Sequence, residues 1–142
     1  MTRPHTDERG STSLELAVLT PVLLVLLALT IAVGRVSVAH GAVDQSAADA
    51  ARAASLARTP AQAQADASDA AATTLAQQGL SCTQLTVTVD TSGFAVPVGQ
   101  SAQVSAQVQC VVDLGDLAVP GLPGSLTETA LMTSPLDVHR GR

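Results

Sequence analysis

The sequence predicts an α+β protein in which a long N-terminal membrane-spanning helix continues into an Ala-rich helical stalk and then into a small three-stranded antiparallel sheet. Three observations support this prediction. An uncharged apolar run occupies residues 16–33, alanine dominates residues 42–78, and apolar and polar side chains alternate from residue 85 onward. The apolar pattern therefore changes from the helical period of about 3.6 residues to the strand period of about 2.

Composition excludes several classes of protein. The 142 residues carry a net charge of −5, with seven Arg, no Lys and Phe94 as the only aromatic residue. A nucleic-acid partner requires a basic face, and bases or sugars bind on aromatic side chains, so neither ligand is expected. Three scattered His and two distant Cys lack the spacing of a metal site. No nucleophile motif is present, and we expect a protein without cofactor or enzymatic activity.

The same patterns divide the chain into five expected segments. These are a polar leader (1–10), a transmembrane helix (11–35), an Ala-rich helical stalk (36–79), a small antiparallel β domain (80–136) and a C-terminal tail (137–142).

The apolar run Leu16–Val33 is long enough to cross a membrane. As a helix its eighteen residues span about 27 Å, and the rest of the chain is too small to surround it. Pro21 predicts a kink, partly compensated by Thr20, and Arg35 marks the membrane boundary, where its side chain can reach the headgroups. The short N-terminal tail and the two downstream cysteines favour a single-pass protein of the cell membrane, with a cytoplasmic N-terminus and an extracytoplasmic domain.

Three interpretations of this apolar segment are open. It could be a secretory signal peptide cut near Ser37-Val38-Ala39, where small residues suit the peptidase. It could be a plain membrane anchor. The third interpretation rests on Gly10, which ends the polar leader, and on Glu15, the fifth residue beyond it, which precedes the apolar run. This spacing is typical of a prepilin signal.

The wider stretch Glu8–Arg35 resembles the TadE-like family, the minor pseudopilins of tight-adherence (Tad/Flp) pilus systems. This stretch and the family pattern share a Gly-Ser pair, a Glu, a Pro about six residues later and a Leu-rich run that ends in Gly-Arg. Ala50–Ala54, which contains Arg52, also resembles the segment that follows the anchor in that family.

The resemblance implies a processing site and an assembly residue. A prepilin peptidase would cut after Gly10 and leave a charged amine on Ser11. Glu15 would pair with that amine on a neighbouring subunit, and the helix Leu14–Ala57 would pack with other pilin or pseudopilin subunits and with the Tad secretion machinery. Alternatively, Glu15 only favours the helix start, with Ser13 as the N-cap.

A narrow apolar stripe follows the membrane segment at spacings of three and four residues. It comprises Val36, Ala39, Val43, Ala47, Ala50, Ala54 and Ala57. The stripe either packs on its own domain or bundles helices in a filament. A second helix is expected over Pro60–Gln78, with Thr59 as N-cap and Gly79 as the stop.

Three strands are expected beyond Leu80. Leu85–Val89 and Val104–Val112 alternate strictly around a turn near residue 96, Leu114–Gly124 predicts a loop, and Ser125–Thr133 predicts a strand that Pro135 ends. Such a hairpin would bring Cys82, at the opening of the first strand, opposite Cys110 on the apolar face of the second.

The two cysteines form either a disulfide or two reduced thiols. A bridge would stabilise the domain by about 3–4 kcal/mol through loop entropy. In a regular strand Cys82 would lie on the opposite face from Val87. A bridge to Cys110 therefore requires a bulge or a later start of the strand.

Two functions follow from these features. The favoured one is a minor pseudopilin or pilus assembly protein of a Tad-type (type IVb-like) pilus, anchored in the membrane and processed by a prepilin peptidase. The alternative is an anchored or secreted extracytoplasmic binding protein unrelated to pili.

Overall fold

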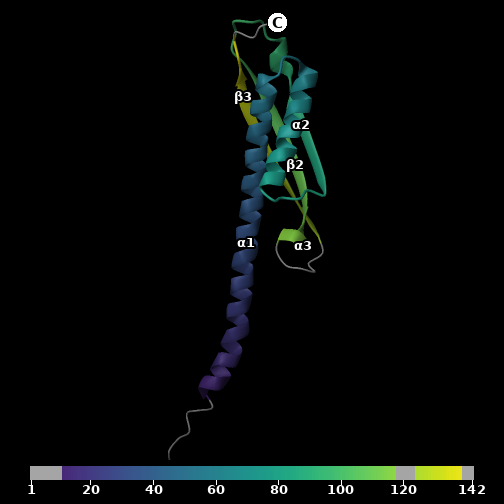
Figure 1. The fold of residues 1–142 in the computed structure, drawn as a ribbon. Coiled ribbons are helices and arrows are strands. Elements are labelled where there is room, and N and C mark those ends of the chain that lie inside the picture. Colours follow the sequence, from purple (N-terminus) through teal and green to yellow (C-terminus); the bar gives the residue numbers. More distant parts are fainter. Residues whose placement is uncertain (1–10, 118–123, 139–142) are drawn as a thin grey trace, which may run out of the picture.

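The computed structural model describes residues 11–117 and 124–138, and it confirms the α+β fold. Figure 1 shows one long helix that runs from the N-terminal side into a small domain of helices and strands. The leader 1–10 and residues 139–142 of the expected tail lie outside the described residues. In chain order the elements are α1 (Ser11–Leu56), α2 (Pro60–Gln77), β1 (Gln84–Asp90), the 3₁₀ helix η2 (Ser92–Ala95), β2 (Ala102–Asp113), α3 (Leu114–Leu117) and β3 (Ser125–Leu136).

The three strands form one antiparallel sheet in the order β1-β2-β3. Val108 in the central strand lies between Val87 of β1 and Ala130 of β3, which fixes the face that each strand turns inward. Helix α1 packs against β2 and β3, while α2 packs against α1 and β1. The domain is therefore a two-layer sandwich of one helical pair on one face of a sheet (Figure 1).

Alanine makes up most of the buried apolar core in the described chain. Within the predicted stripe, Val36 is half-buried and the other six residues are buried. These small side chains meet α2 and the inner faces of β2 and β3, so α1 approaches its own domain closely. The expectation that the stripe packs on its own domain is confirmed. Bundling of helices in a filament through this stripe is wrong, because the same chain already covers it.

The N-terminal part of α1 has the opposite environment. The Leu, Ile and Val side chains from Leu16 to Val33 are exposed around the whole helix, and Leu24 has 60% of its surface accessible. Among the described helices, α1 alone is long and apolar enough to cross a membrane, and its most apolar window of 18 residues has a mean hydropathy of 2.8. A surface of this kind is unstable in water and stable in lipid.

The ends of α2 follow the local signals in the sequence. The Thr59 hydroxyl accepts a hydrogen bond from the Gln62 backbone N–H at 3.2 Å, and Pro60 begins the helix. Gly79 has a φ of +69°, in the left-handed region that ends helices. The predicted helix is confirmed, and it ends one residue early, at Gln77.

Two expectations about the C-terminal region are wrong. Pro135 does not end the third strand, which continues to Leu136 and pairs Pro135 with Gln103. β3 pairs with β2 on one side only, and a proline fits such an edge strand where its missing N–H would point away from the neighbouring strand. The expected loop also begins with a short helix, α3, over its first four residues; residues 118–123 lie outside the described residues.

The outer edge of β1 is partly covered by one side chain of α2. The Gln64 amide donates to the Val87 carbonyl at 2.9 Å, and its oxygen accepts from the Val89 N–H at 3.1 Å. The glutamine thus bonds to β1 as a fourth strand would, which protects part of an exposed edge from pairing with another chain.

Candidate functional site

The predicted processing and assembly residues lie at the N-terminal end of α1. Gly10 is outside the described residues, and Ser11 is the first residue of the helix. Glu15 follows about one turn later on an exposed surface, with no side-chain partner among the described residues. The helix already includes Ser13, so the alternative that Ser13 is the N-cap is wrong.

Pro21 lies inside α1, which continues through it. A proline at this position cannot donate to the carbonyl of Ala17. The Thr20 hydroxyl donates instead to the Leu16 carbonyl, at 2.7 Å. Thr20 was expected to compensate for Pro21. Its hydroxyl bonds to the Leu16 carbonyl and does not replace the missing donor to the Ala17 carbonyl.

Two more hydroxyls along this part of the helix bond to their own backbone. Thr30 donates to the Leu26 carbonyl at 2.8 Å, and Ser37 donates to the Val33 carbonyl at 3.1 Å. Each polar side chain is thus satisfied within the helix, as it must be where no water is available. The apolar segment can enter a bilayer without leaving a hydroxyl unpaired.

Arg35 lies just beyond the apolar run, and its side chain is exposed. Glu15 and Arg35 are about 30 Å apart along the helix axis, because each residue adds about 1.5 Å. The two residues mark the two ends of the apolar segment and do not form one cluster. This separation equals the thickness of a bilayer core, so the geometry suits membrane insertion.

The comparison with known protein families bears directly on this helix. The TadE-like family model matches residues 10–52. The match begins at the predicted processing residue Gly10, runs through the exposed apolar part of α1 and ends at Arg52 in the packed part. It confirms the resemblance inferred from the sequence. No curated protein and no solved structure matches the chain.

The domain that follows the TadE-like segment is cross-linked by a disulfide between Cys82 and Cys110, whose Cα atoms are 5.4 Å apart. Cys110 is buried in β2. Cys82 does not open the first strand as expected, because β1 starts two residues later, at Gln84. The Thr83 N–H and hydroxyl both bond to the Val111 carbonyl, at 2.7 and 3.0 Å, and hold the chain beside β2. The later strand start allows this pairing, and the reduced-thiol alternative is wrong.

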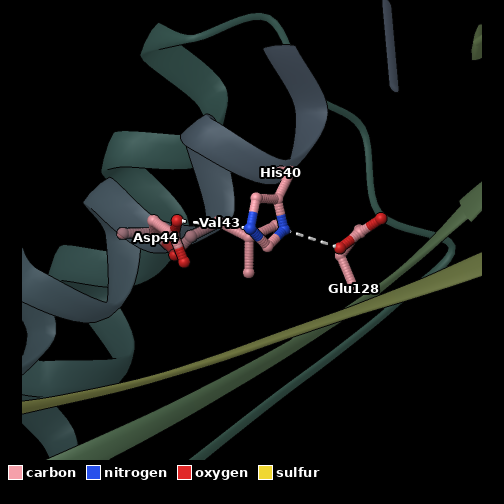
Figure 2. Close-up of polar contacts among 5 residues, drawn as sticks. His40, Val43, Asp44 and Glu128 are labelled. Atoms are coloured by element: carbon pink, nitrogen blue, oxygen red, sulfur yellow. Dashed lines mark hydrogen bonds and ion pairs between the residues drawn. The ribbon is translucent and has the colours of Figure 1, made fainter. Parts of the chain in front are cut away.

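A polar contact that the sequence analysis missed joins α1 to β3 just above the apolar segment. Nδ1 of His40 lies 2.9 Å from Oε2 of Glu128, and Nε2 lies 3.5 Å from Oδ2 of Asp44 (Figure 2). The hydrogen bond to Glu128, followed by the charges of Asp44 and Glu128, raises the pKa of His40 above its ordinary value of 6.5. Because 88 residues separate His40 from Glu128, no local pattern in the sequence could have indicated this contact.

Proposed function

We propose that this protein is a non-enzymatic minor pseudopilin of a Tad-type pilus, anchored in the membrane and processed by a prepilin peptidase after Gly10. One observation carries the proposal. The helix that begins at Ser11 extends beyond its own domain with its large aliphatic side chains from Leu16 to Val33 exposed, and this part of the helix lies within the match to TadE-like proteins. Such a surface needs lipid in the membrane and other helices in an assembly.

The proposed assembly step depends on charge. Cleavage after Gly10 places a positive amine on Ser11, four residues before the Glu15 carboxylate. An unpaired carboxylate in apolar packing costs several kcal/mol, and a cationic partner offsets this cost. The pair would form between the Glu15 carboxylate of one subunit and the Ser11 amine of its neighbour, and it would fix the register of the two helices.

Substitution of Glu15 tests the assembly step in cells that make the pilus. We expect Glu15→Ala to stay inserted with unchanged orientation, because the apolar run remains intact. The Glu15→Ala variant should no longer co-purify with other pilin subunits, and the number of pili should fall. Glu15→Gln behaves in nearly the same way, since it keeps hydrogen bonding but loses the charge pair.

The matched control is Asp69→Ala, which removes an exposed carboxylate from α2, far from the N-terminus. It should leave assembly unchanged. If Glu15→Ala retains both the association with other subunits and the normal pilus number, the assembly role of Glu15 is wrong, and the binding-protein alternative gains support.

A further inference from the structure

A crevice of about 600 Å³ opens where the exposed part of α1 enters the domain. Residues of α1 between Ile31 and Ala42 line one side, and Gln78–Ser81 together with Val112 line the other. Figure 1 shows that this junction, beside the end of α2 and close to α3, is the end of the domain nearest the exposed helix. The crevice therefore faces the surface of any membrane that holds the apolar run.

The depth of the crevice follows from the membrane placement of α1, on which this inference rests. With residues 16–33 in the hydrocarbon core, Arg35 lies at the level of the lipid headgroups. Ile31 lies about one turn deeper, on the acyl-chain side. Gln78 and Ser81 lie across the crevice, in the segment that leads from α2 toward β1.

The lining is amphipathic, and Arg35 is its one charged group. Arg35 makes no ion pair or side-chain hydrogen bond with any residue that the structure describes. Ile31, Val38 and Leu80 supply apolar walls beside it. A phosphate group with a short stretch of acyl chain matches this combination of cation and apolar surface.

We propose that the crevice binds the headgroup of an anionic phospholipid, with the lipid phosphate on the guanidinium of Arg35. Lipid phosphates are always present at this depth, whereas the chain itself carries a net charge of −5 and is otherwise repelled by an anionic surface. A second copy related by a two-fold axis at this crevice would bring its own Arg35 against the first, so like charges disfavour a symmetric pair here.

Gly34 allows the space in the crevice to be tested separately from the charge of Arg35. Glycine is disfavoured inside helices, yet a Cβ built at Gly34 meets no atom of the described residues within 4 Å, so no packing in that part of the chain requires it. Gly34 lines the crevice and keeps its wall open beside Arg35. A larger side chain at this position would fill the crevice without disturbing the domain.

Native mass spectrometry of the full-length protein tests this inference, in micelles that contain phosphatidylglycerol or phosphatidylcholine. We expect the wild-type protein to retain phosphatidylglycerol in preference to phosphatidylcholine. Arg35→Gln should reduce this preference about fivefold, the effect of one basic residue near an anionic lipid surface. Gly34→Leu should reduce retention of both lipids, because it occupies the crevice and leaves the charge in place.

Two matched controls should behave as the wild type does. Gly41→Leu makes the same change two turns along α1, at a glycine that also has open space and does not line the crevice. Arg58→Gln removes an exposed arginine from the far end of the domain. Circular dichroism and an intact disulfide establish that each variant is folded.

Three results would overturn the proposal. They are equal retention of both lipids by the wild-type protein, an unchanged preference in Arg35→Gln, and displacement of phosphatidylglycerol by excess inorganic phosphate, which would indicate a site for free anions. Because the measurement uses purified protein in micelles, its outcome is independent of pilus formation and of the Glu15 experiment.

Discussion

The two parts of α1 belong to one continuous helix but have opposite environments, one exposed and one packed against the domain. The part from Leu16 to Val33 carries large aliphatic side chains that are exposed on all sides, while the part from Ala39 onward buries a stripe of mostly alanine. Both parts are helical throughout, so secondary structure does not explain the difference. Side-chain size does: leucine provides apolar area for lipid, whereas alanine lets a second helix and a sheet approach the backbone.

The comparison also explains why the domain depends on covalent support. Alanine buries little area per residue, so close packing in the domain yields less hydrophobic stabilisation than a core of Leu and Phe would. The disulfide between Cys82 and Cys110 closes a segment of 28 residues and limits the entropy of the unfolded chain. The exposed part of α1 is long and apolar enough to cross a membrane, where lipid would stabilise it without such support.

The largest expected effect comes from opening this bridge. Reduction of the full-length protein in micelles should lower the free energy of unfolding of the domain by about 3–4 kcal/mol. The apolar part of α1 should stay helical in the micelle, so far-ultraviolet circular dichroism should retain a helical signal after the domain unfolds. A domain that unfolds at the same denaturant concentration with and without reductant would show that packing alone is sufficient.

A pair of substitutions contrasts the two parts of α1 directly. Ala47 is 0% exposed, and Ala47→Leu forces extra volume between helix and sheet, which should cost about 1–3 kcal/mol of domain stability. Leu24→Ala removes volume from a position that touches no part of the domain and should leave domain stability unchanged. Chemical denaturation of both variants in micelles measures the contrast, and equal effects would mean that α1 is not divided in this way.

A smaller effect is expected at the start of α2, the helix that covers the alanine stripe. Thr59→Ala removes the side-chain acceptor for the Gln62 N–H and should destabilise the domain by about 1 kcal/mol. Thr73→Ala is the matched control, because Thr73 is exposed in the middle of α2. Thermal unfolding should separate the two variants, and identical midpoints would argue against a role for the cap.

The smallest effect is a pH dependence at the junction of the two parts. The pKa of His40 is raised in the folded protein by Glu128 and Asp44, so the protonated imidazole favours folding. This contribution is fully present below the ordinary pKa of 6.5 and is lost as the pH rises through the raised value. The stability of wild-type protein and of His40→Gln should therefore differ most at mildly acidic pH and converge at alkaline pH. A difference that does not change with pH would exclude this contact as its source.

Patterns local in sequence predicted much of the fold. The change of period separated helices from strands, and the turn near residue 96 brought Cys110 beside Cys82. Pro135 misled because a proline ends a central strand but is tolerated at an edge, and strand order cannot be deduced from local pattern. The contacts of His40 with Glu128 and of Gln64 with β1 join segments far apart in sequence, so only the folded chain shows them.

Features that lie in one continuous segment could be predicted from the sequence, whereas features built from several segments could not. Spacing and a family resemblance predicted the roles of Gly10 and Glu15, which stay predictions, and the apolar run could be found from the sequence because it is one continuous segment. The crevice beside Arg35 combines α1 with the turn after α2 and with β2, and it could not be anticipated from spacing.

The account depends most on α1 being kept whole in the mature protein, with its exposed part still attached to the domain. N-terminal sequencing of protein purified from membranes tests this directly, in cells that contain the prepilin peptidase. We expect the mature chain to begin at Ser11, and a bulky substitution at Gly10 should block this cleavage while leaving insertion intact. A mature chain that begins at His40 would contradict the account, because cleavage there removes the exposed part of the helix and leaves only the domain.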